Sequence, residues 1–430
     1  MNNLRTKYIA QIAIAFILVF STASLSPGFS VLTHEAIIDL TWDGDIKPLL
    51  LKRFPGASAE ELRVAHAHAY GGAIIQDMGY YPFGSRFFSD LTHYVRSGDF
   101  VEALISNSQD LNEYAFALGA LSHYSADNHG HPLGTNRSVP LLFPKLAQKF
   151  GNSVTYAESP TAHIRTEFGF DVLQVSKGRY ASESYHDFIG FKVSASLLER
   201  SFKETYCIEL KSIFTSLDLA LGTYRYSVGT VIPRMTIVAW QTKKSDIESQ
   251  TPGITREKFI YNLPRASYDR EWGTQYKKPG VVAKVFSVLF RIMPKVGPFR
   301  GMTIKASTPE TEKLFLRSFD TTVDYYRKLL GQIRTSGRLD LQNKDLDTGE
   351  PASVQEYRLA DRAYAELLHK LSSRKPEEVP PSLRENILKF YGDTTARGPS
   401  GKDRDDWQKT LSELTRLRNT GIQPGLVEKK

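Results

Sequence analysis

The sequence predicts an all-α protein, and three observations support this. Apolar residues recur at three- and four-residue intervals over long segments, whereas the alternating pattern of half-buried strands is scarce. Clusters of Pro and Gly separate these segments. Of the 430 residues, 41% are hydrophobic and 24% are charged, which is the composition of a folded chain rather than a disordered one. We therefore expect a multi-helix domain followed by a C-terminal helical extension.

The first element, residues 1–28, is predicted to be an export signal. Basic residues precede an apolar run from Tyr8 to Phe20, and small and polar residues follow it. The run is shorter than the roughly 20 residues that a membrane-spanning helix needs, although a retained anchor is the alternative interpretation. Small residues permit cleavage after Ala23 or after Gly28, and the second site would make Phe29 the mature N-terminus. We expect an exported chain, periplasmic or secreted.

Helical periodicity then predicts a series of segments. They are 32–42, 59–76, 109–127, 159–174, 192–227, 309–334 and 354–373. A stretch rich in Pro and charge, from about 243 to 280, separates two helical regions. Residues 281–293 are apolar around most of a helix, which favours a buried helix over one lying in a membrane interface. The polar tail after about residue 393 is expected to fray.

Charge and cysteine content narrow the possible functions. The net charge of +8 favours anionic partners, which include nucleic acid, acidic lipid and phosphate esters. Cys207 is the single cysteine, which excludes an internal disulfide and any multi-cysteine zinc or iron–sulfur site. A metal site in this chain would therefore depend mainly on ligands other than cysteine.

Two histidine–carboxylate pairs share one spacing. His123 precedes Asp127 by four residues, and His163 precedes Glu167 by the same interval. On a helix, residues four apart point from the same face, so each pair can bind one cation. Imidazole and carboxylate are ligands that zinc accepts when no thiolate is present. Further candidate ligands lie upstream, at His34, Asp77 and His93.

This ordered set resembles the zinc-dependent phospholipases C of bacteria, which share a fold with fungal single-strand nucleases. The family pattern is a free mature N-terminus, a nearby His, an Asp, a further His, an H-x-x-x-D-x-x-x-x-x-H element and an H-x-x-x-D/E element. The matching residues here are Phe29, His34, Asp77, His93, His123, Asp127, His163 and Glu167. The motifs span roughly 29–175, and the resemblance implies an all-helical domain that extends to about residue 240.

The sequence departs from the family pattern at two positions. Phe29 stands where the family usually has Trp, but only main-chain atoms bind the metal, so Phe is acceptable if cleavage follows Gly28. The second His of the H-x-x-x-D element would fall at Leu133. His131 is our choice for this shifted ligand, and His129 is the alternative.

The resemblance implies a cluster of up to three zinc ions. One ion would be held by Asp77, His93, His123 and Asp127. A second would be held by the Phe29 main chain, His34 and Asp127 as a bridge, and a third by His131, His163 and Glu167. Such a cluster lowers the pKa of a bound water and neutralises phosphoryl oxygens, which suits phosphodiester hydrolysis. Asp77 is also a candidate general base.

The favoured function is an exported zinc-dependent phosphodiesterase of the phospholipase C type, with phospholipid at a membrane surface as substrate. Alternatives are a zinc-dependent nuclease acting on single-stranded nucleic acid, and a non-catalytic helical domain with a residual metal site. No protein partner is implied. The predicted organisation is a signal peptide (1–28), a catalytic domain (29–245), a linker with the apolar helix (246–305) and a C-terminal helical region with a polar tail (306–430).

Overall fold

The computed structural model describes most of both helical regions. The described residues are 31–177, 191–228, 305–392 and 404–419, together with Ser245 and Glu248. The predicted signal segment, Phe29 and the apolar segment 281–293 lie outside them. The regular structure of the described residues is helical, apart from an isolated bridge between Lys344 and Pro351. The predicted all-α class is confirmed.

The first region consists of many helices, most of them short. They are α2 (Val31–Thr41), η1 (Trp42–Ile46), α3 (Lys47–Arg53), α4 (Ala59–Gly72), η2 (Ile75–Tyr80), α5 (Arg86–Tyr94), α6 (Ser97–Asn107), α7 (Leu111–Gly130), η3 (His131–Thr135), α8 (Asn136–Leu142), α9 (Pro144–Phe150), α10 (Pro160–Ser176), α12 (Ala195–Tyr206), η4 (Leu210–Ile213) and α13 (Leu217–Tyr226). The second region contains α18 (Pro309–Ser336), α19 (Arg358–Ser372), η9 (Pro376–Glu378), α20 (Pro381–Tyr391) and α21 (Arg404–Asn419). None of the described helices is long and apolar enough to cross a membrane.

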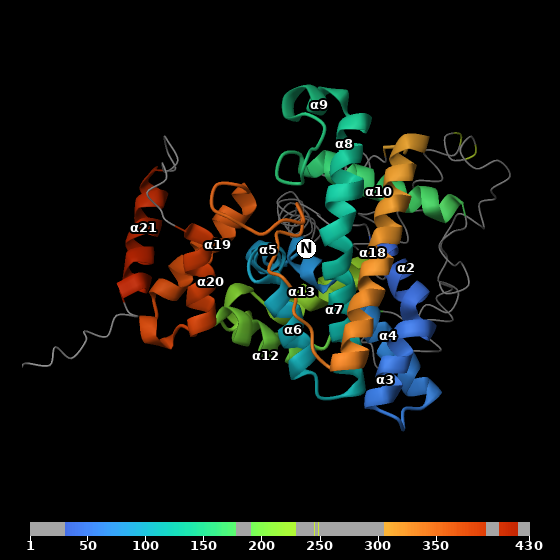
Figure 1. Cartoon of the computed structure of the whole chain (residues 1–430), viewed down its shortest axis with the longest axis horizontal. Coiled ribbons are helices and arrows are strands. Elements are labelled where there is room, and N and C mark those ends of the chain that lie inside the picture. Colours follow the sequence, from blue (N-terminus) through green and yellow to red (C-terminus); the bar gives the residue numbers. More distant parts are fainter. Residues whose placement is uncertain are drawn as a thin grey trace, which may run out of the picture.

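Helix α7 is the central element of the fold. Its N-terminus is capped by Asp110, whose side chain accepts the Glu113 amide at 2.8 Å. It packs against α4 on one side and α18 on another, and Figure 1 shows α18 running beside it. Contact with α4 is very close, because a Cβ on Gly119 would lie 2.1 Å from the Ala69 carbonyl oxygen. Glycine is therefore required where these two helices cross.

Helix α18 joins the second helical region to the first. Thr308 caps it and Pro309 occupies its first turn, an arrangement that favours helix initiation. On its buried face, the Tyr326 hydroxyl donates to the Leu118 carbonyl of α7 at 2.9 Å. A single hydrophobic cluster includes Phe116 of α7 and Leu330 of α18. The described part of the C-terminal region thus shares a core with the first region.

Two expectations from the sequence need correction. Residues 192–227 do not form one helix, because Cys207 adopts a left-handed conformation (φ +56°) that ends α12, and Ser216 caps a new helix, α13. The tail after residue 393 is not wholly frayed, because residues 404–419 form α21. Leu414 and Leu417 of α21 are buried, and this helix packs against α19. Three-residue apolar spacing within a polar segment explains this helix.

Candidate metal centre

Six elements bring the described candidate ligands together. His34 lies on α2, Asp77 on η2, His93 on α5, His123 and Asp127 on α7, His131 on η3, and His163 and Glu167 on α10. Each of these residues is at most 2% exposed. Phe29, the remaining candidate, lies outside the described residues. Residues spread over more than 130 positions therefore form one buried polar cluster.

Asp127 lies at the centre of this cluster. Its two oxygens are close to Nε2 of each of four imidazoles: His123 at 3.1 Å, His93 at 3.3 Å, His34 at 3.7 Å and His131 at 3.8 Å. A fully buried carboxylate surrounded by ring nitrogens is suited to touch more than one cation. The bridging role expected of Asp127 is compatible with this position.

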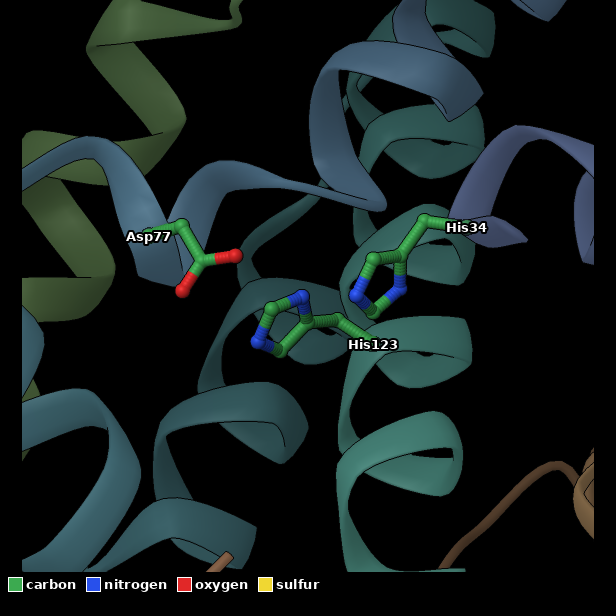
Figure 2. Close-up of side chains that lie close together, drawn as sticks. All are labelled: His34, Asp77 and His123. Atoms are coloured by element: carbon green, nitrogen blue, oxygen red, sulfur yellow. The ribbon is translucent and has the colours of Figure 1, made fainter. Parts of the chain in front are cut away.

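Two compact groups of ligand atoms stand out among the described residues. One contains His34, Asp77 and His123, and the other contains His93, His123 and Asp127. Within each group, one ligand atom per residue lies within 4.8 Å of the others. Figure 2 shows the first group, with side chains that approach one another from three separate elements. The rings of His34 and His123 are stacked, with centroids 4.6 Å apart. His34 thus shares a group with residues that the resemblance assigns to another ion.

The third set of expected ligands lies beside Asp127. His163 Nδ1 is 2.8 Å from Glu167 Oε1, and His131 Nε2 is 4.0 Å from the same oxygen. The rings of His131 and His163 have centroids 5.0 Å apart. These three side chains therefore face a common point.

A π-helical turn accompanies the shifted position of His131. Helix α7 ends at Gly130, and η3 continues it with wider turns, so that the Asn136 amide bonds to the His131 carbonyl. π-Turns inside helices are often found at functional sites. His129 points elsewhere, since its Nδ1 lies 2.9 Å from the Ser125 carbonyl and its ring is against Tyr325. Of the two candidates, only His131 faces the cluster.

Backbone carbonyls orient two of the imidazoles. His123 Nδ1 lies 2.9 Å from the Ala73 carbonyl oxygen, and His93 Nδ1 lies 2.8 Å from the Ser89 carbonyl oxygen. Each Nδ1 therefore donates a hydrogen bond to a carbonyl, which directs Nε2 toward the cluster as the atom that can bind metal. Such contacts are typical of metal-binding histidines.

Buried atoms without hydrogen-bond partners show that this donor set fits a cation. Both carboxylate oxygens of Asp77 and of Glu167 are buried and accept no hydrogen bond from the described residues. Buried polar groups usually have partners, because an unpaired one is costly. Nitrogen and oxygen ligands without a thiolate suit zinc. The residues present thus fit the metal that the resemblance implies.

Burial and mutual charges set the protonation of the cluster. Burial lowers the pKa of both His34 and His163 to about 3, so these rings are neutral at pH 7 and can bind metal. Burial also raises the pKa of Glu167 well above its usual range, and the carboxylate of Asp127 adds to this. For Asp127, burial acts to raise the pKa, but the imidazoles of His123 and His131 outweigh it and hold the pKa well below its usual range.

Sequence reasoning missed one acidic residue at this cluster. Asp347, between α18 and α19, is 2% exposed, and its Oδ1 lies 2.9 Å from His131 Nδ1. Its Oδ2 accepts hydrogen bonds from the hydroxyls of Tyr94, at 2.9 Å, and Tyr357. Asp347 is 180 residues beyond Glu167 and belongs to no helical repeat, so no local pattern connects it with the ligands.

Two other histidines of α4 lie outside the cluster. His66 stacks on Trp42, with centroids 3.8 Å apart, and its Nε2 is 3.2 Å from Asp39. His68 Nδ1 is 3.0 Å from the Ser194 hydroxyl. Both have packing roles on different sides of the helix.

Part of the chain matches a known family. Residues 33–216 match the family model described as zinc dependent phospholipase C. This segment contains all eight of the described candidate ligands but ends before α18 and Asp347. Searches of curated proteins and of solved structures returned no match.

Proposed function

Because residues 33–216 belong to the zinc-dependent phospholipase C family, we propose that the chain is an exported zinc-dependent phosphodiesterase that hydrolyses phospholipids in the manner of a phospholipase C. The observation that carries this proposal is the convergence of four imidazoles on the buried carboxylate of Asp127. A polar cluster of this size inside a helical core has no evident structural use without a cation.

The ligands of the proposed centre are side chains of one cluster. They are His34, Asp77, His93, His123, Asp127, His131, His163 and Glu167, with the main chain of Phe29 as the ninth contributor if the mature chain begins there. Zinc ions bound here would supply Lewis-acid stabilisation of phosphoryl oxygens and activation of water near neutral pH. Up to three ions are proposed, as in the family pattern.

Side chains in and beside the cluster would accept the proton of the attacking water and line the substrate site. Asp77 is the proposed general base, because its buried oxygens accept no hydrogen bond from the described residues. Two tyrosines lie against the cluster: the ring centroid of Tyr80 is 6.0 Å from that of His93, and the ring centroid of Tyr156 is 5.8 Å from that of His163. Burial, with the nearby Asp90 carboxylate, raises the pKa of Tyr80 well above its usual range, so its hydroxyl keeps its proton.

The surface next to the third ligand set supports a lipid substrate. Helix α9 has no buried residue, and Leu141 just before it is 44% exposed. The Phe143 ring is half-buried against a small apolar cluster that includes Ala162, and it has the Arg165 guanidinium and the Lys305 ammonium within 5.6 Å of its centroid. Aromatic and aliphatic groups flanked by cations suit contact with the phosphate-bearing headgroup layer of a phospholipid surface. We therefore propose that this segment contacts the membrane.

The test is a comparison of substrates with one preparation of the full chain. Phosphatidylcholine vesicles and single-stranded DNA are offered at matched zinc, and initial rates are measured. We expect release of phosphocholine and diacylglycerol, loss of this activity with a chelator, and recovery with zinc. Faster cleavage of DNA would replace the lipid proposal by the nuclease. Turnover of neither substrate with zinc bound would indicate a residual metal site without catalysis.

A further inference from the structure

The segment between α18 and α19 contacts the third ligand set. From this contact we propose that Asp347 is a positioning residue, which orients His131 directly and His163 through Asn136 for metal binding. The C-terminal region would then complete the metal centre rather than form a separate unit. This inference rests on the proposed zinc centre, but not on the identity of the substrate.

The direct contact fixes which nitrogen of His131 faces the cluster. Asp347 Oδ1 lies 2.9 Å from His131 Nδ1. The two atoms are not aligned as a hydrogen bond, but the negative charge of a carboxylate at this distance favours the proton on Nδ1 and leaves the lone pair on Nε2. That nitrogen is the one that faces Asp127 at 3.8 Å and Glu167 at 4.0 Å.

The indirect contact, through Asn136, places the proton of His163 on Nε2, whereas the proton of His131 is on Nδ1. Asn136 Nδ2 donates to the Asp347 main-chain carbonyl at 2.7 Å, so its Oδ1 is an acceptor. This Oδ1 lies 2.8 Å from His163 Nε2, which must therefore carry the proton. The lone pair of His163 is then on Nδ1, which is 2.8 Å from Glu167. One segment thus sets the tautomers of both histidines.

Hydrogen bonds hold Asp347 in place, so it can orient the two histidines. Its main-chain amide donates to Asp345 Oδ1 at 2.8 Å, which closes a tight turn. The neighbouring Leu346 amide donates to the His93 carbonyl at 3.1 Å. The hydroxyls of Tyr94 and Tyr357 bind the carboxylate oxygen that does not contact His131. These contacts come from both helical regions, so they require the two regions to be packed together.

The first measurement uses the unchanged protein. Nitrogen-15 NMR of histidine-labelled full chain, before and after zinc addition, reports which ring nitrogen carries the proton. With zinc bound, we expect the remaining proton of His131 on Nδ1 and that of His163 on Nε2, with assignments from His131→Gln and His163→Gln. A proton on Nε2 of His131 would overturn the proposal.

The second measurement uses variants of the full chain and zinc binding by chelator competition. Asp347→Asn keeps the shape but removes the charge, whereas Asp347→Ala removes both. We expect a 10- to 100-fold loss of affinity for one zinc, larger for Ala than for Asn, and unchanged affinity for the others. Asn136→Ala should weaken the same zinc.

The matched control is Glu413→Gln. Glu413 Oε1 lies 2.8 Å from His369 Nδ1, an equivalent pair on the surface of the C-terminal region. This variant should bind zinc as the unchanged chain does. The proposal would be overturned if the Asp347 variants bound each zinc ion as tightly as the Glu413→Gln control does. Altered zinc binding without turnover of lipid or DNA would instead leave this inference intact and reject the proposed function.

Discussion

Gly119→Ala tests whether the close crossing of α4 and α7 positions the metal centre. The new Cβ would lie 2.1 Å from the Ala69 carbonyl oxygen and 2.9 Å from the Ala73 amide nitrogen. Both obstacles are backbone atoms, one in α4 and one in the residue that caps its C-terminus, and no side-chain rotation can remove them. To restore a contact of 3.0 Å, the helices must separate by about 0.9 Å.

That separation would reach the centre because His123 is one turn beyond Gly119 on the same face of α7. His123 Nδ1 lies 2.9 Å from the Ala73 carbonyl, and a further 0.9 Å, roughly, would exceed the range of a hydrogen bond. Overpacking costs about 1–3 kcal/mol, and a lost buried hydrogen bond about 1–3 kcal/mol more. We therefore expect the free energy of unfolding to fall by about 2–6 kcal/mol. Zinc affinity should fall 10- to 100-fold as His123 loses its orienting contact.

Urea unfolding in excess chelator measures the free energy of unfolding. Competition with a chelator measures the zinc affinity. Gly331→Ala is the control, because Gly331 lies within α18 and a Cβ there would meet nothing within 4 Å. It should stabilise the chain by about 0.5–1 kcal/mol, since alanine is the better helix former. A Gly119→Ala chain within about 1 kcal/mol of the unchanged protein, with unaltered zinc affinity, would refute the reasoning.

Three further predictions concern the ligands and the stability of the chain. Asp127→Asn should lose more zinc than Glu167→Gln by elemental analysis, because Asp127 faces four imidazoles and Glu167 faces two; equal losses would argue against a bridge. Elemental analysis with N-terminal sequencing of the exported protein should give close to three zinc ions and a start at Phe29, and a start at Ser24 would leave one site incomplete. Burial, with the nearby Lys192 charge, lowers the pKa of His68 from 6.5 to about 3. Between these values the unfolded chain binds the additional proton, so the stability contributed by neutral His68 is complete above pH 6.5 and is lost as the pH falls. From pH 8 to pH 5 this amounts to about 2 kcal/mol, and His68→Asn should abolish that part of the decline in urea unfolding, whereas an identical decline would contradict the assignment.

The fold class and most candidate ligands could be predicted because the signals are local. His123 with Asp127, and His163 with Glu167, are helical neighbours, so their spacing alone puts each pair on one face. The break at Cys207 was not predicted, because a left-handed residue is usually signalled by glycine or asparagine and Cys207 is neither.

Other features depend on tertiary structure and cannot be predicted from the spacing of residues along the sequence. The grouping of His34 with Asp77 and His123 follows from how α2 and η2 pack onto α7. Asp347 reaches His131 only because α18 turns the chain back across the first region. Periodicity describes single elements, and it says nothing about which distant elements meet.

The packing of α18 against α7 also has a consequence for the order of folding. Tyr326 and Leu118 are 208 residues apart, and Asn136 and Asp347 are 211 residues apart. Contacts of such long range require the closure of large loops and therefore form slowly and late. The helix that carries His123 and Asp127 is synthesised early, yet it gains one whole side of its packing only after α18 has been made. Stable metal uptake should accordingly follow completion of the chain, and refolding of the full chain should include a slow phase.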